Sequence, residues 1–449
     1  MFDQSLSVNN FKVLYNLDRK NKGNLEKDHF PEAYRLRLKI KLLKGFISKL
    51  SFRHKSGRIS SLQYEKRKNI INEHINIRKE TLNKHITHEL SKIAETVNKK
   101  GYALPLTKST IKVKGKEVYS IGKDVETIFV SRHVQRVLSS IYNVKVNNRD
   151  LIISRLSKLA SDNSPKFIIR ADVEKFYESI QHKALLDILH SSPKLSVTPR
   201  RILTQLVRSY ASLVKNDVGL PRGVGISAFL SEIYMSDVDK EISELGDVTY
   251  YERYVDDLIV IFSPTRDDNT SYYLTKINKI IEDRHLNLNN KTNQYDIVNN
   301  TAASFEYLGY KFQIANSKCI IKLGSKKKDK IKSRIEKSIE IYDKEKGLTP
   351  NLAYKNLVLR IKFLTGNTRL LNNKSKAFVG VYFSNKFIND TSDLRSIDGF
   401  FINKLNNLND YRLKKRLTKM SFEKGFNERI FRKFNIVELS QIAKGWKDD

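Results

Sequence analysis

The segment Tyr250–Phe262, YYERYVDDLIVIF, constrains the fold of this chain more than any other stretch. It predicts two strands, YYERY and LIVIF, joined tightly at VDD. The second strand is almost wholly apolar, as a strand buried in a sheet should be. Asp256 and Asp257 would then stand at the tip of a buried hairpin, where an acidic pair is costly unless a cation or base compensates it.

A third carboxylate occupies a similar place earlier in the chain. KFIIRAD is a short β-branched run that ends in Asp172, and VEKFYESIQHKALLDILHSS then has helical periodicity. Three carboxylates on neighbouring strands are the oxygen ligands that Mg²⁺ prefers, and phosphoryl transfer by two metals needs cations about 4 Å apart. Taken singly, Asp172 is an exposed acid before a helix, and the adjacent pair is a commonplace turn. From these residues alone, a shared metal site is supported no better and no worse than two unrelated features, an exposed acid and a turn.

The charge of the chain points to a polyanionic partner. Its 449 residues contain 83 Lys and Arg against 49 Asp and Glu, a formal net charge of +34. Such an excess repels itself unless a polyanion neutralises it, and nucleic acid is the natural candidate. An anionic membrane ranks second, because the charge is spread along the chain instead of being confined to one tract. The length predicts several modules.

Cysteine content and hydropathy predict a soluble cytoplasmic protein without a membrane partner. Cys319 is the single cysteine, which excludes an intramolecular disulfide framework and a multi-cysteine metal site. No apolar run approaches the roughly 20 residues that cross a bilayer. The N-terminal sequence also lacks the basic-then-apolar order of a signal peptide, so we expect an unprocessed chain.

Periodicity gives a coarse map of the elements. Residues 25–97 have basic helical periodicity, KKGYALPLTKSTIKVKGKEVYSIGK predicts short strands, and ETIFVSRHVQRVLSSIYNV predicts a helix. The loop GLPRGVG opens the helix SAFLSEIYMSDVDKEISEL, where Ser227 is a candidate N-cap. A basic helix is expected after Gly324. The last hundred residues are expected to be largely helical apart from AFVGVYFSN.

Five ordered blocks resemble the palm motifs of reverse transcriptases. They are RADVEKFYESI, GLPRGVGISAFLSEIYM, YVDD, LNLNNKT and FEYLGYKF, and they cover residues 166–312. The set is most similar to prokaryotic enzymes: those of retrons, group II introns and the phage-defence-associated (abortive-infection and unknown-group) reverse transcriptases. The C-terminal helical text resembles the defence-associated group more than intron maturases.

The resemblance implies a two-metal polymerase site. Asp172 and Asp256 would bind both Mg²⁺ ions, with Mn²⁺ as the alternative metal, Asp257 as the third acid and the Val173 carbonyl as a further ligand. Lys291 in NLNNKT matches the lysine that protonates departing pyrophosphate; otherwise it is an ordinary loop lysine.

The resemblance also implies a nucleotide pocket. Tyr177, beside Phe176, matches the steric gate whose ring fills the space of a ribose 2′ hydroxyl and so favours dNTPs; core packing is the alternative role. In GLPRG, Gly223 permits close backbone approach. Arg222 occupies a position where relatives often carry Gln, and the resemblance implies that it contacts the incoming nucleotide and the template base. The alternative is that Arg222 is an ordinary surface arginine.

Two further regions match more loosely. FEYLGY, around Leu308 and Gly309, matches the primer-grip hairpin, although strand packing explains the same aromatics. The fingers of such enzymes hold triphosphate and template through basic residues, and a solvated basic face is the alternative. The candidates there are Lys112, Lys114, Arg132 and Arg136.

We therefore expect an α+β, right-hand polymerase fold. Its parts would be a basic helical N-terminal extension (1–95), fingers (96–165), a palm with the reverse-transcriptase motifs (166–322) and a helical thumb with a C-terminal accessory region (323–449). The basic helix from Lys326 would follow the backbone of a duplex, or form a charged solvent face.

The function implied is RNA-directed DNA synthesis from dNTPs in antiphage defence, with a noncoding RNA as template or scaffold. Partners would be that RNA, the DNA product, and a second copy of the chain or a companion defence protein. One alternative is untemplated or protein-primed DNA synthesis, for which Arg222 is a mild hint. Another is an RNA-binding scaffold with an inactive palm, against which the intact acids argue.

Overall fold

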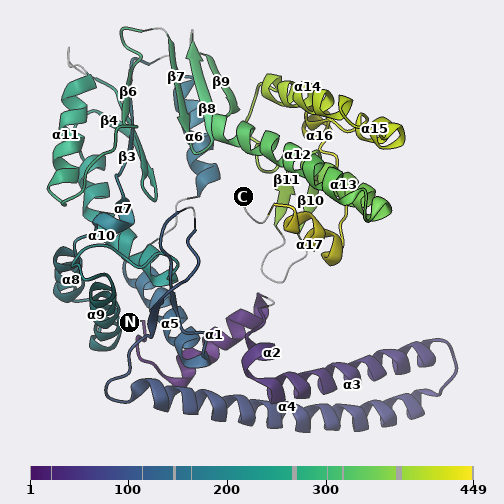
Figure 1. Ribbon diagram of the computed structural model, residues 1–449. Coiled ribbons are helices and arrows are strands. Elements are labelled where there is room, and N and C mark those ends of the chain that lie inside the picture. The colour runs from purple at the N-terminus through teal and green to yellow at the C-terminus, as the bar shows by residue number, and fades with distance from the viewer. Residues whose placement is uncertain are drawn as a thin grey trace. The chain divides into compact units, whose positions relative to one another are not determined.

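The computed structural model describes residues 2–21, 23–113, 115–144, 148–162, 164–264, 270–300, 302–315, 318–370 and 377–446 (Figure 1). The chain divides into two compact units, each assembled from two separate stretches. The first unit contains Met1–Lys145 and Lys175–Asp237. The second contains Val146–Glu174 and Val238–Asp449.

The first unit is mainly helical, as the periodicity of its sequence predicts. Its one described sheet is the antiparallel pair β1–β2, in which Lys108 lies opposite Tyr119. The elements are α1 (Val8–Lys20), α2 (Leu25–His29), α3 (Pro31–Lys55), α4 (Ser61–Asn98), β1 (Leu106–Lys108), β2 (Tyr119–Ile121), α5 (Val125–Ile141), α7 (Phe176–Ser179), α8 (His182–Ser191) and α9 (Val197–Val214); α10 (Gly225–Ser243) begins here and ends in the second unit.

Local signals in the sequence set where several of these helices begin. Pro31 starts α3, since its fixed φ suits the first turn and its missing N–H has no partner to lose there. The Ser60 side chain accepts a hydrogen bond from the Gln63 amide at the start of α4. Helices α3 and α4 then run antiparallel as a long hairpin (Figure 1).

Two expectations about helices in this unit were wrong in detail. The periodic stretch after Asp172 is two helices, because Ile180 and Gln181 are extended and Gln181 bridges to Val218. Ser227 is not an N-cap. It lies inside the first turn of α10, and its hydroxyl donates to the Pro221 carbonyl at 2.8 Å, which ties the helix to the preceding loop.

The second unit is built on an antiparallel sheet of order β4-β5-β3-β6. These strands are β3 (Phe167–Asp172), β4 (Val248–Tyr254), β5 (Asp257–Phe262) and β6 (Asn293–Asp296). The predicted strands YYERY and LIVIF are confirmed, with the tight turn between β4 and β5. From Leu258 to Phe262 no side chain is more than 2% exposed, so β5 is the buried strand that its apolar run predicts.

A second antiparallel sheet, β7-β8-β9, follows in the same unit. Its strands are β7 (Ala302–Tyr307), β8 (Tyr310–Ala315) and β9 (Lys318–Leu323), and α6 (Arg149–Ala160) and α11 (Thr270–Glu282) complete this part. Leu308 and Gly309 form the tight turn between β7 and β8, both at positive φ. The Arg149 guanidinium donates to the Leu308 carbonyl, 3.1 Å from Nε, and so holds the turn.

The predicted basic helix after Gly324 and the helical C-terminal region are confirmed. The elements are α12 (Ser325–Glu345), α13 (Pro350–Leu364), β10 (Asn367–Arg369), β11 (Phe378–Gly380), α14 (Ser392–Asn406), α15 (Tyr411–Leu417), α16 (Phe422–Asn427) and α17 (Ile436–Lys444).

One apolar core runs from α6 through both sheets to α16. It includes Cys319, and burial raises the pKa of this thiol to about 11. Among the described residues, no helix is both long and apolar enough to span a bilayer.

Candidate active site

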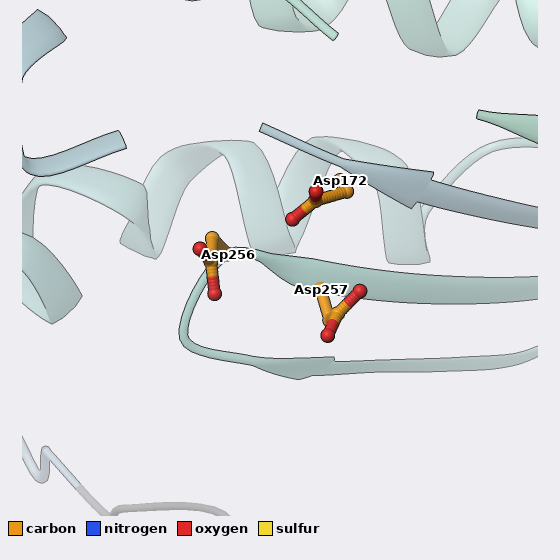
Figure 2. A group of neighbouring side chains, drawn as sticks. All are labelled: Asp172, Asp256 and Asp257. Carbon is orange, nitrogen blue, oxygen red and sulfur yellow. The ribbon is translucent and has the colours of Figure 1, made fainter. Parts of the chain in front are cut away.

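Three carboxylates meet at one end of the β4-β5-β3-β6 sheet (Figure 2). Asp172 ends β3, Asp257 begins β5, and Asp256 occupies the turn between β4 and β5. One oxygen from each lies within 4.8 Å of the others, and all three residues are partly buried. The group therefore offers a small volume bounded by anionic oxygens.

Strand pairing fixes the backbones of these residues. Asp172 lies directly opposite Asp257 in the antiparallel register of β3 and β5. The Val173 amide donates to the Asp256 carbonyl at 3.0 Å, and the Asn289 amide donates to the Asp172 carbonyl at 2.8 Å. Because main-chain hydrogen bonds define these positions, the carboxylates keep their mutual arrangement without depending on one another.

The turn holding Asp256 is strained and is held by a buried arginine. Val255 has φ +62°, a conformation that costs a β-branched residue about 1–3 kcal/mol. Arg253, only 3% exposed, donates to the Val255 carbonyl at 2.8 Å. Its guanidinium is held in turn by both carboxylate oxygens of Asp239, each at 2.7 Å. Arg253 is thus a positioning residue for the turn.

Positive charge offsets the three acids. Arg170 donates to Oδ1 of Asp257 at 3.0 Å, and Nζ of Lys291 lies 3.9 Å from Oδ2 of Asp172. The Asn289 side chain also donates to Asp172. Burial raises the pKa of Asp257, and the Arg170 guanidinium opposes that rise. Arg170 and Lys291 thus each compensate one of the acids.

The donor set fits a divalent metal ion. Asp172, Asp256 and Asp257 supply hard oxygen ligands, and their partial burial makes an uncompensated cluster unfavourable. Val173 follows directly in the chain and is buried. The structure thus brings four of the expected site residues together, with Lys291 beside them.

A second group of expected site residues lies in the first unit. Arg222 makes a bidentate ion pair with Glu178, from Nε to Oε1 at 2.7 Å and from Nη2 to Oε2 at 2.8 Å. The same guanidinium carbon lies 5.0 Å from the ring centroid of Tyr177. The Phe176 ring contacts Tyr177 edge-on, with centroids 5.7 Å apart. We call Phe176, Tyr177, Glu178 and Arg222 the gate cluster.

The loop carrying Arg222 is packed against β2. Gly223 has φ +92°, and a Cβ there would lie 2.5 Å from Cγ1 of Val118 and 2.7 Å from the Tyr119 carbonyl oxygen. The Tyr119 amide donates to the Arg222 carbonyl at 2.7 Å. Only glycine fits this approach without displacing β2.

The expected fingers residues have separate surroundings. Lys112 is exposed, and Lys114 lies outside the described residues. Arg132, on α5, forms an ion pair with Asp18 at 2.8 Å. The Arg136 guanidinium carbon lies 5.0 Å from the centroid of the Phe2 ring. Among the expected fingers residues that the structure describes, Arg132 and Arg136 thus contact different partners.

Sequence reasoning missed several residues that support the aspartates. Arg170 precedes Asp172 by two positions, and side chains two apart in a strand lie on the same face. The sequence could therefore have predicted Arg170 as a neighbour of the acids. Asn289 lies in the LNLNNKT block. Tyr307, in FEYLGY, donates from its hydroxyl to the Asp257 carbonyl at 3.2 Å. The Arg253–Asp239 pair joins β4 to α10, and no sequence pattern near either residue predicts this contact.

The fold and this carboxylate cluster define the class: an α+β protein whose sheet brings together three aspartates that could hold a divalent metal ion. Residues 73–312 match the family model described as "Reverse transcriptase (RNA-dependent DNA polymerase)". This span is more than half of the chain, and the chain belongs to the reverse transcriptase family, an enzyme family of nucleotidyltransferases. The expected right-hand polymerase fold class is thereby confirmed.

Solved structures give a weaker likeness. The apo telomerase from Candida tropicalis, truncated from its C-terminal domain, is 14% identical with a TM-score of 0.35, over 49% of this chain and 55% of that one. Telomerase from Candida albicans in complex with a TWJ fragment of telomeric RNA is 14% identical with a TM-score of 0.35, over 77% and 62%. This chain thus spans less than two thirds of either. No curated protein matches it.

Proposed function

We propose that this chain is an RNA-directed DNA polymerase that joins dNTPs onto a 3′ hydroxyl. The observation that carries the proposal is the convergence of Asp172, Asp256 and Asp257 within the span that matches the reverse transcriptase family. Three acids from distant stretches, offset by Arg170 and Lys291, are what a phosphoryl-transfer site needs.

In this proposal the three aspartates hold two Mg²⁺ ions, with Mn²⁺ as the alternative. Bound there, the ions would lower the pKa of the attacking hydroxyl and neutralise the triphosphate. The Val173 carbonyl is a further ligand. Lys291 is the proton donor to departing pyrophosphate, a role supported by an exposed ammonium group near Asp172.

The gate cluster selects the sugar in this proposal. Tyr177 excludes a ribose 2′ hydroxyl, with Phe176 behind it, and Arg222 with Gly223 faces the incoming nucleotide and template base. The stacking of Arg222 on Tyr177 supports a fixed ring orientation. Lys112, Lys114 and Arg132 are proposed to contact triphosphate or template, although Arg132 has Asp18 as its present partner.

The proposed domains are an N-terminal extension (1–95), fingers (96–165), palm (166–322) and thumb with accessory region (323–449). The net charge of +34 supports an RNA template or scaffold and a DNA product as partners. The resemblance of the sequence blocks supports a prokaryotic, defence-associated enzyme that acts in the cytoplasm with a noncoding RNA. A second copy or a companion protein completes the proposed assembly.

The experiment is dNTP incorporation by the purified chain with Mg²⁺, followed by sequencing of the product and of copurifying nucleic acid. A product complementary to bound RNA supports templated synthesis. A noncomplementary product with nucleotide linked to Tyr or Ser, found by mass spectrometry, supports the untemplated, protein-primed alternative. RNA binding without any incorporation supports the inactive scaffold.

A further inference from the structure

The helical hairpin of α3 and α4 presents an apolar groove to solvent. Figure 1 shows the two helices side by side, projecting from the other helices of the first unit. A groove of about 530 Å³ lies between them, and its apolar lining residues are Phe46, Leu50, Ile70 and Ile71. Leu50 is buried in the hairpin, whereas Phe46 is 54% exposed and Ile70 is 49% exposed. The contact between the two helices thus leaves further apolar side chains uncovered beside it.

The apolar surface continues along both helices beyond this groove. Residues seven apart lie on nearly the same face of an α-helix, so Leu42 shares a face with Lys49, and Ile77 shares a face with Ile70. Leu42 is 65% exposed and Ile77 is 53% exposed. We call Leu42, Phe46, Ile70 and Ile77 the hairpin strip. Exposed apolar residues that gather on one surface, instead of being scattered singly, mark an interaction site.

The rim of the groove is basic. Lys49, Arg53 and Arg67 line it, and no acid is among its described lining residues. None of these three side chains forms an ion pair with another residue that the structure describes. Helix α3 as a whole contains eight Lys and Arg and a single acid, Glu32. The groove therefore combines an apolar floor with a positively charged rim.

The chemistry of the groove favours one occupant over three others. A second copy of the chain would bring an identical basic rim against this one, and like charges at close range are unfavourable. Nucleic-acid bases stack on flat rings, and among the described lining residues only Phe46 has such a ring, while Ile70 and Ile71 are aliphatic. An anionic membrane takes up an outward-facing apolar surface, whereas this floor lies between two helices. A helix with an apolar face flanked by acids matches both the floor and the rim.

We propose that the groove between α3 and α4 binds an acidic, amphipathic helix of a partner protein, so that three helices share one apolar core. Apolar side chains of that helix pack on the hairpin strip, and its carboxylates pair with Lys49, Arg53 and Arg67. The companion protein of the proposed function is the expected source of the helix. None of these residues belongs to the strands that carry the aspartates, so docking does not require polymerase activity.

A designed peptide tests the proposal with the full-length chain. It has about three heptads, with Leu at positions a and d and Glu at positions e and g, so that it is amphipathic as a helix and its like charges oppose self-pairing. We call it the Glu peptide. One control peptide has the same composition in scrambled order, and another has Lys in place of each Glu. Fluorescence anisotropy of each labelled peptide is followed as the chain is added, with divalent ions chelated.

We expect saturable binding of the Glu peptide and much weaker binding of both control peptides. The scrambled peptide keeps the negative charge but has no apolar face, and the Lys peptide keeps the apolar face but repels the rim. Failure of the Glu peptide to bind overturns the proposal. Equal binding of either control peptide also overturns it, because charge alone or apolar contact alone would then explain the result.

Matched substitutions locate the binding on the chain. Phe46→Ser removes an apolar side chain of the groove and Lys49→Glu reverses a charge on its rim, so each should weaken binding of the Glu peptide about tenfold. Phe52→Ser and Lys44→Glu change residues of the same helix outside the groove and should leave the affinity unchanged. All four side chains are exposed, so thermal unfolding should stay close to that of the unaltered chain. Equal losses in the groove variants and the controls overturn the proposal.

The other occupants are tested with Phe46→Ser and the unaltered chain. Sedimentation of the chain alone, binding of a labelled RNA hairpin and binding to vesicles that contain phosphatidylserine are measured for both. We expect all three to be the same in the variant. Dissociation of a dimer, or loss of RNA or vesicle binding, overturns the proposal because it assigns the groove to that occupant. Binding of the Glu peptide should persist in Asp256→Ala, which separates this result from failure of the proposed polymerase activity.

Discussion

The aspartate group and the gate cluster are held in place by different kinds of contact. Around Asp172 and Asp257, main-chain hydrogen bonds and the β3–β5 register set the positions, and the buried Arg253 supports the turn that carries Asp256. In the gate cluster, the Arg222 side chain is held by the Glu178 carboxylate, and both side chains are partly exposed to solvent. Main-chain pairing within a buried sheet tolerates little adjustment, whereas a half-exposed ion pair is weak and adaptable. In the proposed enzyme, the metal-binding residues are thus held by strand pairing, and the residues that select the sugar are held by side-chain contacts.

The largest effect is expected at the rigid group. Asp256→Ala should reduce dNTP incorporation by at least about a thousandfold, because it removes an oxygen ligand from the proposed metal site. Folding and RNA binding should remain nearly intact, since Asp256 is partly exposed and contributes no core volume. Incorporation and thermal unfolding are measured together. Asp283→Ala, at an exposed acid, is the control, and undiminished incorporation by Asp256→Ala would refute the assignment.

The sheet beneath the aspartates should be sensitive to lost volume. Ile259→Ala in β5 removes a fully buried side chain, so the free energy of unfolding should fall by about 2–5 kcal/mol. Ile320→Ala, at a site that is 42% exposed, should change it by less than about 0.5 kcal/mol. Chemical denaturation measures both variants. Similar losses in the two would contradict the view that β5 is the rigid base of the site.

The gate cluster should show a smaller and more selective effect. Glu178→Gln removes the charge that holds Arg222 over Tyr177, so discrimination between dNTPs and rNTPs should fall by about tenfold. The measurement is the ratio of kcat/KM for the two substrates. Glu282→Gln, at an exposed glutamate, is the matched control. Unchanged discrimination together with slower synthesis would mean that Glu178 supports folding and not the orientation of the gate.

The smallest expected effect concerns Lys327, a side chain held by a main-chain and a side-chain oxygen. Burial lowers the pKa of Lys327 from 10.5 in the unfolded chain to about 7 in the folded protein. Between these two pH values the lysine is protonated in the unfolded chain and mostly neutral in the folded protein. Stability should therefore rise as the pH increases from about 7 toward 10, by on the order of 1 kcal/mol after solvent screening. Lys327→Met should flatten that rise in a denaturation series. An unaltered slope in the variant would assign the pH dependence to other groups.

Strand patterns in the sequence predicted the elements that carry the aspartates. An apolar run beside two acids predicts a buried hairpin, and KFIIRAD predicts another strand that ends in an acid. These patterns left it even whether the three acids meet, and the resemblance to reverse transcriptases was needed to predict that they do. Contacts between distant side chains were not predictable in the same way. Glu178 and Arg222 are 44 residues apart, and either residue alone has the pattern of a surface charge.

The strained turn illustrates the same limit. Nothing in YVDD indicates that Val255 takes a left-handed conformation or that Arg253 is buried to support it. That outcome depends on Asp239, which α10 brings to the strand. Ser227 was misassigned because a serine near a loop has the composition of an N-cap, while the actual start of α10 depends on how the preceding loop packs.

The burial of Cys319 makes the chain convenient for covalent labelling. It is the single cysteine in the sequence, and its thiol, with a pKa near 11, stays protonated at neutral pH and therefore reacts slowly with maleimides. A cysteine introduced at an exposed position such as Lys55 or Lys344 would be labelled selectively without first removing the native thiol. Fluorophores or spin probes attached in this way could report on nucleic-acid engagement in an otherwise unaltered chain.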